Sequence, residues 1–249
     1  MMKSIDIHAY YGPWPWPIGV DWTVPSILKI MDEYEIEKAI FMSNLALLYD
    51  FREGNRILKE AIDGEERLFG YVVVNLNYPE ESIEEIRTYF KYRNFVGAKI
   101  HQVFAETPVN VKRGKPAIQE LARHNRPLLV HTFDERLEPY SSPLHAVEVA
   151  EEHPDLKIIL GHMGGYHWMT AVKAAQQAEN IYLDLQSSCI DRDKIAETVS
   201  ELGAKKILFG TGMTEGAPER SLGMIEDAEI TTREKEMILY KNAKDIFRL

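Results

Sequence analysis

The segment Lys157-Ile158-Ile159-Leu160-Gly161-His162 shows the pattern that decides the fold: a short, continuous apolar run that ends in a histidine. Seven similar runs recur along the 249 residues. Runs rich in Ile, Val and Leu, without alternation of apolar and polar residues, are typical of strands that are buried on both faces. We therefore predict eight buried strands, over residues 3–8, 38–42, 68–74, 96–101, 127–131, 157–162, 180–185 and 205–210.

Amphipathic stretches separate these strands, and several begin with a proline, which suits the first turn of a helix. One strand–helix unit starts roughly every 23–35 residues. Eight such units fill the chain and no linker divides it, so we predict an α/β fold with a single (β/α)8 TIM barrel over residues 1–249. The alternative, an open doubly wound sheet, would show fewer units and usually a Gly-rich phosphate turn, which the sequence lacks. The predicted helices cover residues 25–34, 55–62, 79–89, 116–124, 143–152, 168–178, 191–202, 218–227 and 232–242.

Composition excludes several classes of protein. The chain carries 39 acidic and 29 basic residues, a net charge of −10, whereas nucleic-acid binders usually show a basic surplus. The lone Cys189 allows no internal disulfide, and no apolar run is long enough to span a membrane. We expect a cytoplasmic enzyme that acts on a small molecule, with no nucleic-acid or membrane partner. Pairing into a homodimer stays open.

Histidines mark the carboxyl ends of four predicted strands: His8, His101, His131 and His162. In a parallel barrel these ends meet on one face, which is where catalytic groups of such barrels lie. Imidazole titrates near neutral pH and binds zinc, iron, nickel and copper. The four residues therefore predict one pocket suited to metal binding or proton transfer.

At these positions the sequence resembles the amidohydrolase superfamily, in its amidohydrolase-2 branch of barrel metal-dependent hydrolases and decarboxylases. The resemblance extends over essentially the whole chain and implies a (β/α)8 barrel with a divalent metal, often zinc, that activates a water. The segments that carry it follow in the family's order: Ile5-Asp6-Ile7-His8-Ala9-Tyr10, Gly97-Ala98-Lys99-Ile100-His101, Leu129-Val130-His131, Leu160-Gly161-His162-Met163-Gly164-Gly165, Ile181-Tyr182-Leu183-Asp184, Leu208-Phe209-Gly210-Thr211-Gly212 and Lys241-Asn242-Ala243-Lys244-Asp245-Ile246-Phe247.

The resemblance implies that His8, His131 and His162 hold the metal, for which zinc is the first expectation. The sequence departs from the family at two ligand positions, because Tyr10 replaces the second histidine of the first strand and Gly212 replaces the aspartate of the eighth. Three histidines are enough for a catalytic zinc site. The loss of two ligands nevertheless leaves a protein without metal as an open alternative.

Three loop carboxylates are candidates to replace the missing aspartate. Glu215 follows Gly212 closely, while Glu106 and Asp134 follow the histidines of the fourth and fifth strands. For each of them, a solvated surface acid is the alternative interpretation.

The remaining site candidates surround the histidines. Lys99 and His101 lie two residues apart and so share the inward face of the fourth strand. With His162, they are the candidate catalytic residues that orient a carboxylate- or carbonyl-bearing substrate; for Lys99, an ion pair with Asp6 or another inward acid is the alternative. The candidate substrate-binding residues are Tyr10 and, in the stiff Pro-rich loop that follows it, Trp14 and Trp16.

These residues lead to one main functional hypothesis and two alternatives. The main hypothesis is a metal-assisted amidohydrolase-like hydrolase that cleaves a C–O or C–N bond in a small carboxylate-bearing cyclic amide, ester or lactone. The first alternative is a nonoxidative decarboxylase of an aromatic or enol acid, for which Lys99 and the Trp-rich loop are suited. The second is a catalytically degraded barrel that binds a small molecule, which the loss of the aspartate at Gly212 favours.

Overall fold

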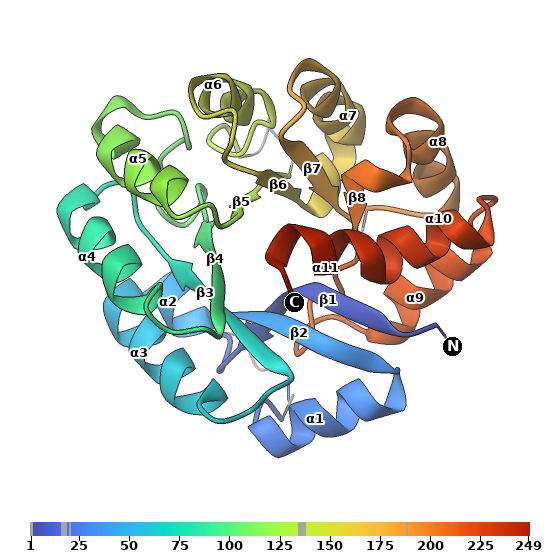
Figure 1. Ribbon diagram of the computed structural model, residues 1–249, viewed down its shortest axis with the longest axis horizontal. Coiled ribbons are helices and arrows are strands. Elements are labelled where there is room, and N and C mark those ends of the chain that lie inside the picture. The colour runs from blue at the N-terminus through green and yellow to red at the C-terminus, as the bar shows by residue number, and fades with distance from the viewer. Residues whose placement is uncertain (1, 16–18, 20, 134–137, 188) are drawn as a thin grey trace.

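Eight parallel strands form one sheet in the order β1-β2-β3-β4-β5-β6-β7-β8, and the helices surround it (Figure 1). The computed structural model describes the chain except for residues 1, 16–18, 20, 134–137 and 188. The predicted (β/α)8 barrel is confirmed. Its strands are β1 (Ser4–Tyr11), β2 (Ile36–Ser43), β3 (Leu68–Val73), β4 (Phe95–Ile100), β5 (Leu128–His131), β6 (Ile158–Gly161), β7 (Ile181–Asp184) and β8 (Ile207–Leu208).

The barrel closes between β1 and the segment that follows β8. The backbone N–H of Ile7 donates to the carbonyl of Phe209 at 3.0 Å, and the N–H of Gly212 donates to the carbonyl of His8 at 2.7 Å. The segment after β8, at Phe209–Gly212, is therefore hydrogen-bonded to β1, and His8 of β1 lies beside this segment.

Helices follow the strands much as predicted, with two differences near the ends of the pattern. A short helix, α2, was not predicted; the hydroxyl of Ser43 accepts a hydrogen bond from Ala46 N at its start. The predicted last helix consists of α10, a π-helical turn at Met237–Lys241 and α11. The helices are α1 (Val24–Glu33), α2 (Asn44–Leu48), α3 (Phe51–Ile62), α4 (Pro79–Tyr89), α5 (Lys115–Arg123), α6 (Leu144–Glu152), α7 (Trp168–Gln177), α8 (Arg192–Leu202), α9 (Pro218–Asp227), α10 (Thr232–Glu236) and α11 (Asn242–Phe247).

Alternate residues of the strands pack into two hydrophobic clusters, as expected for strands that are buried on both faces. On β5, Leu128 and Val130 belong to the cluster under the helices, whereas Leu129 belongs to the cluster inside the barrel. Tyr71 also lies in the inner cluster, and its hydroxyl donates to the carbonyl of Ile7 at 2.8 Å. Within the described part of the chain, no helix is long and apolar enough to cross a membrane.

Candidate active site

The four predicted histidines meet at the carboxyl end of the barrel. The ring centroids of His101 and His131 are 4.0 Å apart, those of His131 and His162 are 4.7 Å apart, and those of His162 and His8 are 4.8 Å apart. They come from β1, β5 and the segments that follow β4 and β6. Parallel strand order thus gathers imidazoles that are far apart in the sequence into one cluster.

A pocket of about 460 Å³ opens over this cluster, a size typical of small-molecule sites. Its wall combines aromatic rings, imidazoles and carboxyl groups. Among the described residues, these groups come from Tyr10 and Phe133, from His131 and His162, and from Glu138 and Glu215.

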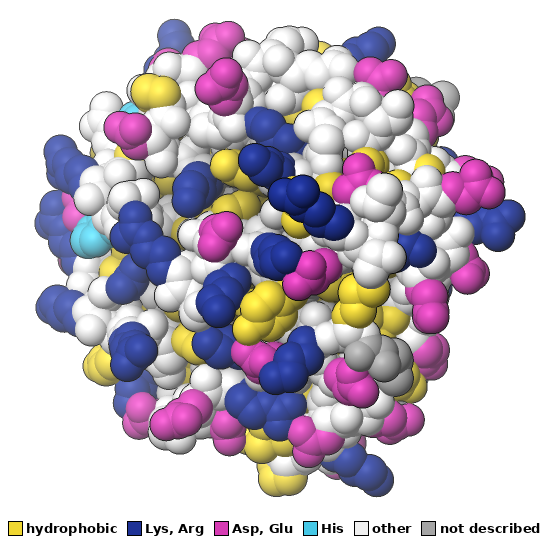
Figure 2. All heavy atoms as spheres, turned by 45° about the vertical axis from the view of Figure 1, so that its right-hand side comes forward, with side chains coloured by type: hydrophobic (Ala, Val, Ile, Leu, Met, Phe, Trp, Pro, Cys, Tyr) yellow, Lys and Arg dark blue, Asp and Glu magenta, His cyan; other side chains and the backbone are white. Residues whose placement is uncertain are grey.

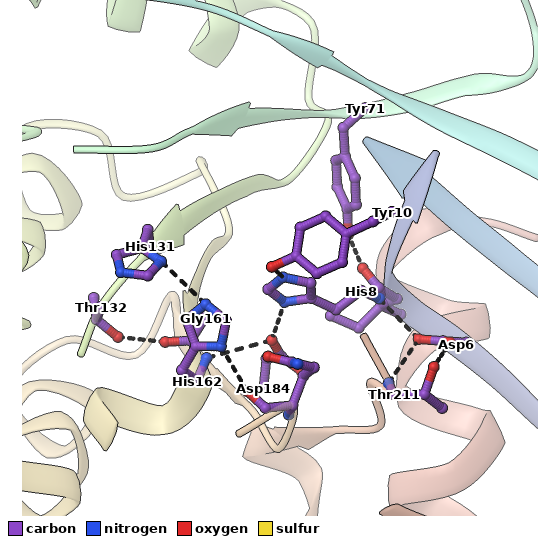
Figure 3. A network of polar contacts seen from close by, with 12 residues as sticks. Asp6, His8, Tyr10, Tyr71, His131, Thr132, Gly161, His162, Asp184 and Thr211 are labelled. Atoms are coloured by element: carbon purple, nitrogen blue, oxygen red, sulfur yellow. Dashed lines mark hydrogen bonds and ion pairs between the residues drawn. The ribbon is translucent and has the colours of Figure 1, made fainter. Parts of the chain in front are cut away.

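At the floor of the site, His8 is held between Asp184 and Tyr10 (Figure 3). Its Nδ1 lies 2.5 Å from Asp184 Oδ2, and its Nε2 lies 2.9 Å from the Tyr10 hydroxyl. Burial raises the pKa of Asp184 to about 6, and burial together with the charge of Lys99 lowers the pKa of His8. A neutral His8 therefore donates from Nδ1 to Asp184 and accepts the Tyr10 proton at Nε2.

A glycine makes this contact possible. A Cβ on Gly210 would lie 2.4 Å from Asp184 Oδ1 and 2.8 Å from the Cβ of His8. Any side chain at this position would separate the buried carboxylate from the imidazole.

A second chain of hydrogen bonds runs along the pocket wall through His162, His131 and Glu138 (Figure 3 shows its first link). The Nδ1 of His162 lies 2.7 Å from the carbonyl of Gln186, and its Nε2 lies 3.0 Å from His131 Nδ1. The Nε2 of His131 lies 3.0 Å from Glu138 Oε2.

The carbonyl of Gln186 fixes the direction of this chain, because a carbonyl only accepts. His162 must donate from Nδ1, so its Nε2 accepts the proton of His131 Nδ1. Burial lowers the pKa of both histidines, which keeps them neutral. The contact between His131 Nε2 and Glu138 Oε2 is then a hydrogen bond when one of these two atoms carries a further proton.

Lys99 lies on β4 with no exposed surface. Within the described part of the chain, its Nζ has no hydrogen-bond partner, so the structure does not form the ion pair that was the alternative for this residue. Burial lowers the pKa of Lys99 to about 7, against the opposing effect of Asp184. Asp6 instead accepts hydrogen bonds from His8 N and from both the N–H and the hydroxyl of Thr211. Burial raises the pKa of Asp6 to about 7.

The side chains do not fit the metal site that the resemblance implied at His8, His131 and His162. Over the described residues, no group of three or more His, Cys, Asp and Glu side chains is placed to hold a metal ion. The imidazole nitrogens that would hold a metal are engaged in hydrogen bonds. Nε2 of His162 is hydrogen-bonded to Nδ1 of His131, and Nε2 of His8 is hydrogen-bonded to the Tyr10 hydroxyl.

The two substituted positions strengthen this mismatch. Burial raises the pKa of Tyr10, so its phenol stays neutral and is a poor metal ligand. A Cβ on Gly212 would lie 2.2 Å from Gln186 Nε2, which means that the side chain of Gln186 takes the space in which an aspartate would stand.

The predicted substrate-binding aromatic residues differ in their positions. Tyr10 lines the pocket, whereas Trp14 is not among its lining residues and packs edge-to-face on Tyr10, with ring centroids 5.0 Å apart. Trp16 lies outside the described residues. Trp14 therefore supports the pocket wall from behind.

The three candidate carboxylates also differ. Glu215 lines the pocket, and burial raises its pKa. Glu106 is exposed on the loop after β4 and does not line the pocket. Asp134 lies outside the described residues.

Sequence reasoning missed the roles of Asp184, Glu138 and Gln186. Asp184 had a usable signal, since it lies near the end of the predicted strand over residues 180–185 and is the last residue of β7. Glu138 and Gln186 had none, because both come from irregular segments whose path decides what they reach.

The comparisons place the chain among known proteins. It matches the amidohydrolase family (Amidohydro_2) over residues 5–249, and it belongs to this family. A curated relative is the gamma-resorcylate decarboxylase of Rhodococcus jostii (strain RHA1). It is 22% identical over an alignment 284 residues long, gaps included, which covers 89% of this chain and 86% of that protein.

Solved structures share the barrel at low sequence identity. The 2,6-dihydroxybenzoate decarboxylase from Rhizobium has a TM-score of 0.79 at 18% identity and covers 100% of this chain and 99% of its own. A dihydroxybenzoic acid decarboxylase from Polaromonas sp. JS666, with bound manganese and 2-nitroresorcinol, has a TM-score of 0.81 at 18% identity and covers 100% and 98%. The main prediction of a hydrolase is therefore wrong, because these relatives are decarboxylases and match the first alternative.

Proposed function

We propose that this barrel catalyses the nonoxidative decarboxylation of a small, hydroxylated aromatic acid. The observation that carries the proposal is the contact between His131 Nε2 and Glu138 Oε2, 3.0 Å apart at the wall of the pocket, to which we assign the proton that the reaction needs. The names of the relatives support the same class of reaction.

The reaction needs such a proton. When the bond between the ring carbon and the carboxylate breaks, carbon dioxide leaves and the electron pair stays on the ring carbon. One proton must then be added there, so that an arene and carbon dioxide are the only products. A positioned acid typically contributes about 10²–10⁴-fold to the rate of such a step. In this chain, the His131–Glu138 pair takes the place of the acid lost at Gly212.

The rest of the pocket suits a flat anion. Phe133 and Tyr10 provide aromatic faces, and the Tyr10 hydroxyl provides a polar edge. Lys99 lies beneath, where its electrostatic influence extends to His8, His131 and Asp184. We infer that Lys99 attracts the substrate's negative charge toward the floor of the site.

A metal has no step in this proposal, because the donor atoms of His8, His131 and His162 are bonded elsewhere. Three of the similar solved barrels carry manganese, so Mn²⁺ is the first ion to test, with Zn²⁺ as the second.

The test is carbon dioxide release from a panel of mono- and dihydroxybenzoates in the presence and absence of added Mn²⁺ or Zn²⁺. In D2O, the product should carry one deuterium at the position that the carboxylate left. Glu138→Gln should lower kcat about 100-fold or more with an unchanged melting temperature. The exposed acid of the neighbouring loop gives the matched control, Glu106→Gln, which should leave kcat unchanged.

Two outcomes would contradict the proposal. Folded protein that releases no carbon dioxide from any acid of the panel, with or without metal, would leave a binding protein as the remaining alternative. Full activity in Glu138→Gln would remove the proton donor that we assign.

A further inference from the structure

A second and larger pocket lies at the amino end of the barrel, opposite the histidines. Its volume is about 950 Å³. The turns that precede β3, β4 and β5 surround it together with the end of α11, which Figure 1 shows near the centre of the view. The apolar interior of the barrel separates it from the candidate active site.

Four cations line this pocket: Lys38, Arg93, Arg126 and Arg248. None of them forms an ion pair with another described residue. Elsewhere in the chain, arginines are commonly paired with carboxylates, as shown by Arg52, Arg56, Arg67, Arg87, Arg123 and Arg192. The pocket therefore gathers positive charge that the described protein does not neutralise.

Arg126 is the most constrained of the four. Its guanidinium carbon lies 4.4 Å from the centre of the Phe90 ring, and its Nη1 is buried without a hydrogen-bond partner in the described part of the chain. A buried guanidinium N–H without an acceptor is costly. Because Arg126 lines the pocket, its guanidinium can also donate to an anionic oxygen placed there.

One of the three acidic side chains that line the pocket is paired with a cation. Asp63 forms an ion pair with Lys59 at 2.9 Å, whereas the side chain of Glu65 accepts a hydrogen bond from the neutral Arg67 N at 3.1 Å and keeps its charge. Glu65 and Glu66 therefore oppose the four cations.

The topology concentrates this charge. Basic residues lie just before or at the start of strands along the barrel, and all strand starts of a parallel barrel lie at one end. Figure 2 views this side obliquely and shows Lys and Arg side chains gathered across it, although the chain as a whole carries a charge of −10. In the sequence, the basic residues just before the strands are Lys3, Arg67, Arg93, Arg126, Lys157 and Lys206, of which Lys3 and Arg67 are paired with Glu37 and Asp32.

We propose that the pocket at the amino end binds a small polyphosphate, such as pyrophosphate or the diphosphate of a nucleotide. The planar guanidinium of arginine pairs with two phosphate oxygens at once, and three arginines line this pocket. The four cations exceed the carboxylates of Glu65 and Glu66 by two charges, which the adjacent phosphates of a diphosphate can balance. This site is independent of the proposed decarboxylation.

The test is isothermal titration calorimetry of the protein at low salt, which measures the dissociation constants of pyrophosphate, ADP and inorganic phosphate. Pyrophosphate and ADP should both bind saturably and more tightly than phosphate, and binding should weaken as salt rises. Arg126→Met should weaken pyrophosphate binding at least tenfold. Arg248→Ala, at an exposed position, should weaken it as well and serves if Arg126→Met does not fold.

Two controls locate the site. Arg233→Ala removes an exposed arginine of α10 outside the pocket and should leave binding unchanged, and so should Glu138→Gln at the other end of the barrel. The proposal is overturned if neither diphosphate binds, or if Arg126→Met and Arg248→Ala both bind pyrophosphate as tightly as the unmodified protein.

Discussion

The polar groups at the two ends of the barrel differ in whether they have partners within the protein. At the carboxyl end, Asp184, His8 and Tyr10 are fully buried or nearly so and are joined by hydrogen bonds of 2.5 and 2.9 Å. At the amino end, Arg93 and Arg248 are exposed around a wide pocket and have no ion pair within the described structure. Polar groups that satisfy one another's hydrogen bonds contribute to the stability of the fold. Cations without ion pairs contribute little to it and leave their charge for a ligand to neutralise.

The largest change in folding stability should follow from removing the carboxylate of Asp184 at the carboxyl end of the barrel. Asp184→Ala leaves the buried Nδ1–H of His8 and the N–H of Gln186 without their carboxylate. Each buried donor without an acceptor costs about 1–3 kcal/mol, so we expect the free energy of unfolding to fall by roughly 3 kcal/mol. Urea unfolding at pH 7 measures it.

Asp184→Asn is the matched variant, because an amide keeps one acceptor oxygen. It should lose clearly less stability than Asp184→Ala. Equal stability of Asp184→Ala and the unmodified protein would mean that the network at the carboxyl end does not support the fold.

Replacing Lys99 should give the next largest change in stability, and this change should be a gain. Replacing a buried charge by an apolar side chain of similar length is stabilising by about 1–4 kcal/mol in comparable cases, so Lys99→Met should unfold at higher urea at pH 7. The same variant should lose decarboxylase turnover if Lys99 attracts the substrate. A variant that is both more stable and inactive would identify Lys99 as kept for function.

The pH dependence of this gain follows from the lowered pKa of Lys99, about 7 in the folded protein against 10.5 in the unfolded chain. Between these values the unfolded chain binds more protons, so the unmodified protein becomes more stable as pH rises. The advantage of Lys99→Met should therefore be largest at pH 7 and shrink toward pH 10. An advantage that does not change with pH would contradict the burial of a titrating amine.

The smallest effect is expected at the amino end. Arg93→Ala removes an exposed cation without an ion-pair partner among the described residues, so stability should change by no more than about 0.5 kcal/mol. Thermal unfolding in buffer without phosphate measures this directly. A loss of several kcal/mol would show that the arginines of the amino end support the fold, and would remove the contrast between the two ends.

The sequence was sufficient for the barrel because burial on both faces leaves a signal in every strand. Seven of the strands match the predicted runs closely. β8 is shorter, at Ile207–Leu208, and single backbone hydrogen bonds join the segment after it to β1. The short helix α2 escaped prediction, since five residues are too few to show a helical period.

For the site, the sequence predicted which residues meet but not how they bond. His8, His131 and His162 converge as expected because strand ends share a face. Whether two imidazoles share a metal or a proton depends on ring rotations and on neighbours such as Gln186 and Glu138, which are brought in by irregular segments. Residue type and spacing carry no information on these angles.

The side chain of Gln186 occupies the space beside Gly212 into which a Cβ would project. Gly212→Asp would place its Cβ 2.2 Å from Gln186 Nε2, on a backbone with φ of +74°. A side chain at position 212 therefore requires the flexible end of Gln186 to move aside and a non-glycine residue to accept a left-handed backbone. The rotamer of Gln186 thus decides whether a carboxylate can stand at position 212.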